Sequence, residues 1–238
     1  MRQSLWTREE THGTFCKRTG TACFISFGEM DRPFQLPYCG GHLPGRRSQP
    51  RGLFIAELRL HVADRPDAVI ANRRKVAARL GVSFEALTFA DQVHGNDIAI
   101  ITERERGMGR ESMETALQKT DGFVSNVAGV VLCAMFADCV PLYFVDPVRK
   151  AVGLAHAGWK GTVLRIAEKT VRAMTESFGS RPEDILGAVG PSIGVCCYEV
   201  DQMVIDRVKE ALGPDNFGDA GIMIPCLFTK ENRAENTC

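Results

Sequence analysis

The sequence has no net charge and no long apolar segment, and each absence excludes a class of protein. Lys plus Arg and Asp plus Glu both number 29, which removes the general electrostatic attraction that nucleic-acid and basic membrane-surface proteins use. The longest apolar stretch, Ala128 to Ala137, is about ten residues long. A membrane-spanning helix needs roughly 18 to 20 apolar residues. We therefore expect neither a nucleic-acid partner nor a membrane partner.

Signals for export and for disulfide scaffolding are also lacking. Charged residues interrupt the first ten positions, where a signal peptide carries its apolar segment. The nine cysteines are an odd number and are too few for a disulfide scaffold, so we expect free thiols or metal ligands. Together these features predict a cytoplasmic protein.

What is present is an average globular composition, with 45% hydrophobic and 24% charged residues. A length of 238 residues, against about 150 for a typical domain, favours one large unit. Residues 1 to about 55 show no sustained periodicity. Beyond them, helical patterns and short apolar runs mix without strict β-α-β alternation, which predicts one layered α/β or α+β domain.

The periodic segments and their boundaries predict three helices and six strands. The helices are expected over 64–80, 163–178 and 203–212, each followed by a glycine, and the strands over 87–93, 98–101, 130–136, 142–145, 151–155 and 185–189. Pro141 argues against one unbroken strand through the adjacent runs 130–136 and 142–145.

Three candidate metal ligands, His94, Cys139 and His156, each lie at the end of a predicted apolar strand. Their spacings of 45 and 17 residues differ from the compact pairs of a structural zinc module, so the fold would have to assemble any shared site. Two imidazoles and a thiolate leave a fourth position open, as catalytic zinc sites do. Two other interpretations remain open. Cys139 could be a nucleophile with His156 as its base, or all three side chains could be structural.

Residues next to these ligands could complete a site. Asp138 could orient a histidine, transfer a proton or end a strand as a turn residue. The turn Gly158–Thr162 opens the predicted helix that follows it, where free N–H groups favour an anion such as phosphate, and Lys160 would add positive charge. A plain turn is the alternative, because the spacing of a Walker A phosphate-binding loop is absent. Tyr198 is a further cleft candidate.

Four ordered motifs resemble the YfiH/laccase-domain family, which is known both as polyphenol oxidase (laccase-like) and as purine nucleoside phosphorylase. They are Gln92–Gly95 (QVHG), Ala137–Pro141 (ADCVP), His156–Gly161 (HAGWKG), and Gly190–Ile193 (GPSI) with Cys197–Val200 (CYEV). The match covers about residues 53 to 212. It implies a YfiH-like single domain of α+β class with mixed α/β layers, shared distantly with cysteine hydrolase-like toxins.

The two ends of the chain depart from the family pattern. Residues 1–52 form an atypical segment that matches poorly, and the domain over 53–238 lacks the family's closing Arg-rich segment. We therefore expect its C-terminal part to be truncated or divergent. Loss of substrate-contacting residues there would weaken or abolish activity.

The resemblance implies that His94, Cys139 and His156 bind a metal, with Zn²⁺ expected and Cu²⁺ as the alternative. It implies phosphorolysis of adenosine, inosine and methylthioadenosine together with adenosine deaminase activity. A copper-dependent polyphenol oxidase and a Cys-His hydrolase are the alternatives. The partners would be a small-molecule nucleoside and phosphate, while the oligomeric state is not predicted.

Residue roles follow from the same resemblance. The segment 60–64 resembles a family segment that places His61 near the pocket. Cys139, Asp138 and His61 are the catalytic candidates. Lys160 and Tyr198 are the substrate-binding candidates.

Overall fold

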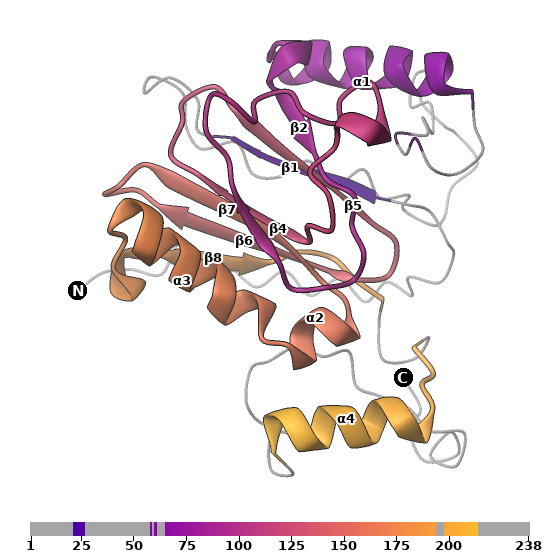
Figure 1. The fold of residues 1–238 in the computed structure, drawn as a ribbon, viewed down its shortest axis with the longest axis vertical. Coiled ribbons are helices and arrows are strands. Elements are labelled where there is room, and N and C mark those ends of the chain that lie inside the picture. Colours follow the sequence, from indigo (N-terminus) through magenta and orange to yellow (C-terminus); the bar gives the residue numbers. More distant parts are fainter. Residues whose placement is uncertain (1–20, 27–57, 59, 61–64, 194–197, 214–238) are drawn as a thin grey trace, which may run out of the picture.

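Two β-sheets pack face to face, and each carries a helix on its outer side (Figure 1). This computed structural model describes residues 21–26, 58, 60, 65–193 and 198–213. The strands are β1 (Thr21–Ser26), β2 (Leu87–Phe89), β3 (Ile98–Ile100), β4 (Gly122–Ser125), β5 (Val131–Phe136), β6 (Val140–Asp146), β7 (Ala151–Ala157) and β8 (Leu186–Val189). The helices are α1 (Pro66–Leu80), α2 (Trp159–Val163), α3 (Ile166–Phe178) and α4 (Gln202–Leu212).

The smaller sheet has the strand order β1-β5-β2 and the larger sheet the order β3-β4-β7-β6-β8. The β2–β5 and β3–β4 pairs are parallel, and the other pairs are antiparallel. Both sheets are therefore mixed, and the layered α+β class expected from the sequence is confirmed. No helix among the described residues is long and apolar enough to cross a membrane.

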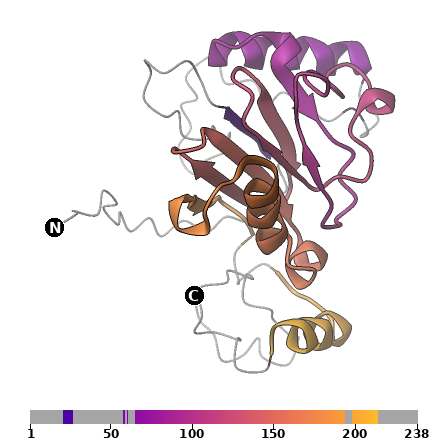
Figure 2. The ribbon, with the colours of Figure 1, turned by 60° about the vertical axis from the view of Figure 1, so that its left-hand side comes forward.

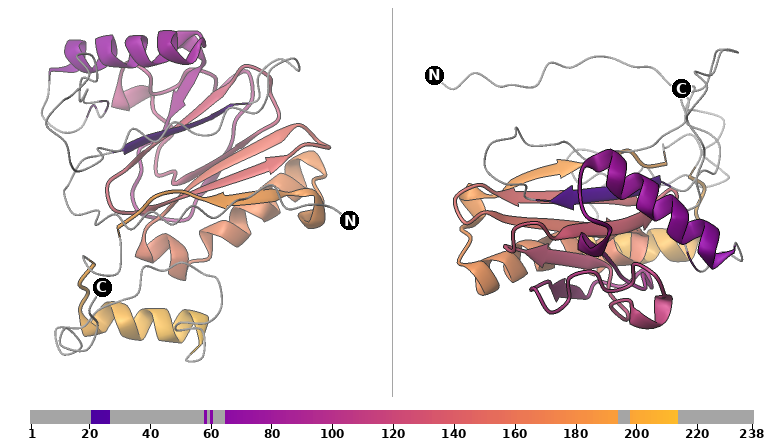
Figure 3. Two further views of the ribbon diagram at one scale, coloured as in Figure 1. Left: turned by 180° about the vertical axis from the view of Figure 1, so that it is seen from behind. Right: turned by 90° about the horizontal axis from the view of Figure 1, so that it is seen from above.

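Alternation along β5 sorts its side chains between two layers. Leu132, Ala134 and Phe136 face the larger sheet in the central core, whereas Val131 and Cys133 pack beneath α1. Figure 3 shows α1 lying across the strands when the molecule is seen from above. Because both faces of β5 are covered, its sequence is a continuous apolar run rather than an alternating one.

Helix α3 covers the outer face of the larger sheet (Figure 2), where Ile166 and Met174 are fully buried. Gly153 of β7 permits this close approach. A Cβ atom at that position would lie 3.1 Å from Thr170 Cγ2 and 3.4 Å from Met174 Sδ. An added side chain would therefore push the strand or the helix side chains aside by a few tenths of an ångström.

The single helix expected over 163–178 is divided into α2 and α3. Arg165 lies between them with φ 58° and ψ 47°, a left-handed conformation that interrupts a right-handed helix. The apolar residues whose spacing predicts one helix lie on both sides of this break, with Val163 in α2 and Ala167, Val171, Met174 and Phe178 in α3. The expectation that the Gly158–Thr162 turn opens the long helix is therefore wrong, since it belongs to a five-residue helix.

Two strands were not predicted, and one proline lies elsewhere than expected. Strand β4 has only four residues, and β1 lies in the segment without periodicity. The predicted break between the two apolar runs is present over residues 137–139, but Pro141 itself lies inside β6. Its carbonyl accepts a hydrogen bond from the Gly190 N–H at 2.8 Å, so the strand loses only the donor that proline lacks.

Candidate metal centre

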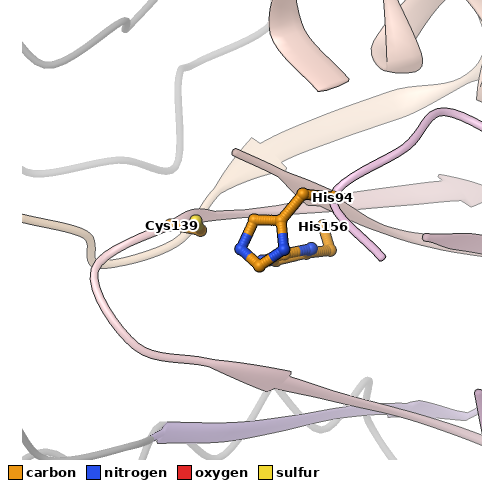
Figure 4. A group of neighbouring side chains, drawn as sticks. All are labelled: His94, Cys139 and His156. Carbon is orange, nitrogen blue, oxygen red and sulfur yellow. The ribbon is translucent and has the colours of Figure 1, made fainter. Parts of the chain in front are cut away.

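Three segments far apart in the chain bring His94, Cys139 and His156 together (Figure 4). His94 lies between β2 and β3, Cys139 in the turn between β5 and β6, and His156 near the carboxyl end of β7. One ligand atom from each side chain lies within 4.8 Å of the others. His94 is exposed, Cys139 half-buried and His156 buried, so the cluster runs from the surface into the fold.

His156 is fixed on both sides of its ring. Its side chain is 4% exposed, and its Nδ1 lies 2.9 Å from Asp121 Oδ1. The ring meets that of Phe136 edge to face at 5.3 Å between centroids. Burial alone would lower the pKa of His156. Its interactions with Asp121 and with Cys139 outweigh that effect and raise the pKa to about 9.

Asp121 is a buried residue of the site that the sequence did not indicate. It directly precedes β4, and its carboxylate accepts hydrogen bonds from the backbone N–H groups of Val93, His94 and Gly95. Burial raises its pKa, but the hydrogen bonds from His156 and from these backbone groups leave the pKa below its usual value. The sequence offered one weak signal for Asp121, namely that it directly precedes a short apolar run. That run forms β4, a strand that was itself not predicted.

The two cysteines that the structure describes as free thiols have opposite environments. For Cys139, burial raises the pKa, but the neighbouring His156 and His94 outweigh burial and lower the pKa to about 7. For Cys133 in β5, burial dominates and raises the pKa far above its usual value. Cys139 is therefore the thiol suited to ligate a metal or to act as a nucleophile.

A small cleft opens beside Cys139. Its lining residues are Asp138, Cys139, Val140, Ala157, Gly158, Trp159, Thr162, Ile193 and Tyr198. Burial, followed by the charges of Cys139 and Asp138, raises the pKa of Tyr198. Asp138 has φ 75°, and its carbonyl accepts a hydrogen bond from the Ile193 N–H at 2.9 Å. Asp138 is thus a turn residue that also borders the cleft.

Of the two remaining candidates from the sequence, the structure describes Lys160 but not His61. Lys160 is exposed on α2, with Nζ 5.7 Å from the Trp159 ring centroid, and Trp159 lines the cleft. His61 lies outside the described residues. Lys160 is therefore a neighbour of a cleft residue rather than a lining residue itself, and the roles of Lys160 and His61 stay predictions.

A larger cavity of about 460 Å³ lies between β6, β8 and α3. Its lining is mostly apolar and includes none of His94, Cys139 and His156. Val140, Ala157 and Thr162 line both this cavity and the small cleft. We place the candidate reaction site in the cleft, because Cys139, Asp138 and Tyr198 line it and His94 and His156 lie next to Cys139.

The donor set fits a transition-metal ion. Two imidazoles and one thiolate are ligands that both zinc and copper accept, and they leave a coordination position for substrate. Asp121 at Nδ1 of His156 is the carboxylate partner that metal-bound histidines commonly have. The residues present are thus compatible with the metal that the family resemblance implies.

Known proteins resemble this chain in both sequence and fold. Residues 52–221 match a family model described as multi-copper polyphenol oxidoreductase laccase. The purine nucleoside phosphorylase YlmD of Bacillus subtilis strain 168 is 47% identical over 150 residues, which are 63% of this chain and 54% of that protein. The crystal structure of YfiH from Bacillus licheniformis is 46% identical with a TM-score of 0.61, covering 68% of this chain and 61% of that one.

A relative with a different named activity also matches. The adenosine deaminase RL5 of an unknown prokaryotic organism is 37% identical over 151 residues, which are 63% of this chain and 57% of that protein. The chain therefore spans little more than half the length of these curated relatives.

Proposed function

This chain belongs to the family described as multi-copper polyphenol oxidoreductase laccase, and on that premise we propose that it is a metal-dependent purine nucleoside phosphorylase with adenosine deaminase activity. The observation that carries the proposal is the meeting of His94, Cys139 and His156 within 4.8 Å, beside a cleft. Relatives named for phosphorolysis and for deamination support it. The proposed substrates are adenosine, inosine and methylthioadenosine.

In phosphorolysis, a phosphate oxygen forms a bond to C1′ of the ribose while the bond from C1′ to N9 of the purine breaks. The bonding electrons leave with the purine, which takes up a proton. Lys160, whose Nζ lies over the Trp159 ring, would bind the phosphate, and Trp159 and Tyr198 in the cleft lining would contact the flat purine. Asp138 or His61 would supply the proton.

In deamination, the oxygen of water forms a bond to C6 of adenine, and the amino group leaves as ammonia after taking up a proton. His94, Cys139 and His156 would hold the metal, with zinc proposed and copper as the alternative. When bound, the ion would polarise the attacking water. The same proton carrier could serve both reactions, because each breaks a bond between carbon and nitrogen and the nitrogen-containing leaving group must take up a proton.

Metal content and phosphate dependence test the proposal on the full chain. We expect about one zinc per chain in the wild type, loss of zinc in Cys139→Ala, and retention in the matched control Cys133→Ala, whose thiol lies in the core under α1. Adenine release from adenosine should need phosphate and should be lost only in Cys139→Ala. Adenine release without phosphate, or full activity of Cys139→Ala, would contradict the proposal.

A Cys-His hydrolase is a second candidate, favoured by the lowered pKa of Cys139 beside His156. Sγ would attack an acyl carbon, His156 would protonate the leaving group, and water would then release the acyl group from sulfur. The discriminating measurement is hydrolysis of an activated ester by chelator-treated protein. Turnover that persists without metal and disappears in Cys139→Ala would favour the hydrolase, whereas complete loss on chelation would favour the metal enzyme.

The copper-dependent polyphenol oxidase implied by the family description is the remaining alternative. Its test is oxygen uptake with a phenol by copper-loaded protein, compared with Cys139→Ala loaded in the same way. Oxygen uptake confined to the wild type, with no phosphate-dependent release of adenine, would favour the oxidase.

A further inference from the structure

We infer that Asp121 is the positioning residue of this site, a single buried carboxylate that orients both histidines. The inference rests on the proposed function only in taking His94 and His156 as metal ligands. The supporting observation is that the Asp121 side chain forms hydrogen bonds with both His94 and His156, which lie more than sixty residues apart in the sequence.

The carboxylate of Asp121 has its accepting capacity filled. Oδ1 accepts from the His94 N–H at 3.0 Å and from Nδ1 of His156 at 2.9 Å. Oδ2 accepts from the Gly95 N–H at 2.7 Å and from the Val93 N–H at 3.2 Å. An ionised carboxylate offers about four acceptor sites. The side chain is 0% exposed, so water cannot replace a lost donor.

The first consequence concerns His156. Because Nδ1 donates to Asp121, Nε2 is the ring nitrogen left to ligate a metal. The main chain strengthens this arrangement, since the His156 N–H donates to the Asp121 carbonyl at 2.7 Å. Side chain and backbone of Asp121 thus fix both the position and the rotation of the imidazole.

The second consequence concerns His94. This residue has φ 60°, a left-handed conformation that is unfavourable for any residue with a side chain. The three consecutive N–H groups of Val93, His94 and Gly95 converge on the carboxylate, in the manner of a backbone nest around an anion. The turn that presents His94 is therefore closed around Asp121, and the carboxylate determines where that imidazole leaves the backbone.

The test compares Asp121→Asn with a matched control, Asp146→Asn. Asp146 is also 0% exposed and also accepts from two backbone N–H groups, at the turn between β6 and β7. An asparagine keeps the size of the side chain, but its NH₂ group cannot accept hydrogen bonds. We expect zinc affinity, measured by competition with a chelator, to fall about 10- to 100-fold in Asp121→Asn. It should stay unchanged in Asp146→Asn.

Two further readouts separate positioning from general destabilisation. The visible spectrum of the Co²⁺-loaded protein should change its ligand-field bands in Asp121→Asn and not in Asp146→Asn, because the band positions report ligand geometry. In the metal-free protein, amide hydrogen exchange at Val93, His94 and Gly95 should speed up in Asp121→Asn alone. Unfolding midpoints of both variants, recorded with chelator, show that each is folded.

The outcomes are distinguishable from a failure of the proposed function. Wild-type zinc affinity and unchanged amide exchange in Asp121→Asn, or an equal loss of affinity in Asp146→Asn, would overturn the inference. If the wild type bound no metal, the proposed function would fail, while the exchange of the three amides would still decide whether Asp121 holds the His94 turn. If the protein bound zinc and Asp121→Asn weakened it, the inference would stand even without nucleoside turnover.

Discussion

The imidazole rings of His94 and His156 meet edge to face, with centroids 4.8 Å apart and planes inclined by 72°. His94 is exposed in the turn before β3, whereas His156 is buried in β7. The pair thus joins a solvent-exposed side chain to one that is buried in the sheet. Cys139 lies at the same end of the larger sheet, and its chemistry depends on both rings.

The thiol of Cys139 should titrate near neutral pH in the metal-free protein. Burial opposes ionisation, but His156 and His94 lower the pKa to about 7, so the thiolate dominates above that pH and is lost as the pH falls below it. Alkylation by iodoacetamide, followed by peptide mass spectrometry, should reach half its maximal rate near pH 7. The buried Cys133 should stay unmodified in the folded protein. A midpoint near the ordinary thiol value of about 8.5 would contradict this prediction.

Gly158 should be sensitive to an added methyl group. A Cβ atom there would lie 3.1 Å from His94 Cδ2 and 3.2 Å from Cys139 Sγ, so Gly158→Ala must displace both side chains slightly. We expect zinc affinity to fall about tenfold with little change in the unfolding midpoint. Gly187→Ala is the control, because its Cβ would meet only the Tyr143 carbonyl oxygen, at 4.0 Å. Equal zinc affinities in the two variants would contradict the prediction.

Local signals allowed part of the fold to be predicted from the sequence. Helix α1 has Pro66 at its start and ends at Gly81, which adopts φ 70°, and both features could be anticipated from residue type. Strand β4 could not, because four residues starting at Gly122 carry too little periodicity. The break at Arg165 also left no trace, since a left-handed arginine leaves the apolar spacing unchanged.

The site, like the fold, could be predicted only where the sequence carries a local signal. His94, Cys139 and His156 stand out as chemically capable residues beside apolar runs, although β2 ends at Phe89 and His94 lies five residues further on. Asp121 could not be recognised in the same way. Its role depends on the pairing of β4 with β7, which brings its carboxylate to His156, and no local pattern encodes that pairing.

Arg73 should contribute strongly to stability although it is charged. It is 2% exposed, and its guanidinium donates to the carbonyls of Leu58, Gly109 and Arg110 while lying over the Phe89 ring. Arg73→Met would remove the three hydrogen bonds that the guanidinium donates to these carbonyls. The free energy of unfolding should therefore fall by about 3 to 5 kcal/mol.

The neighbouring Arg74 provides the control for Arg73. Its side chain is 53% exposed, and it pairs with Glu111 and lies over the Phe84 ring. Arg74→Met should cost no more than about 1 kcal/mol, because an exposed ion pair contributes little. Urea denaturation of both variants measures the difference, and equal losses would show that Arg73 is not the anchor described.

Arg165→Gly should stabilise the protein, although glycine usually weakens a helix. Arg165 holds φ 58° between α2 and α3, and a residue with a side chain loses about 1 to 2 kcal/mol in that conformation. Relief of this strain, less the greater freedom of glycine in the unfolded chain, should raise the free energy of unfolding by about 0.5 to 1 kcal/mol.

Arg172→Gly, the same substitution in the middle of α3, should change the free energy of unfolding in the opposite direction. Arg172 is exposed, has helical neighbours on both sides, and pairs with Glu168 at 2.7 Å. Arg172→Gly should lower the free energy of unfolding by about 1 kcal/mol, because glycine is a poor helix former. Urea denaturation of the two variants measures both changes in the free energy of unfolding. A loss of stability in Arg165→Gly would mean that its contacts with Glu168 and with the Ala211 carbonyl outweigh the backbone strain, and that these contacts fix the break after α2.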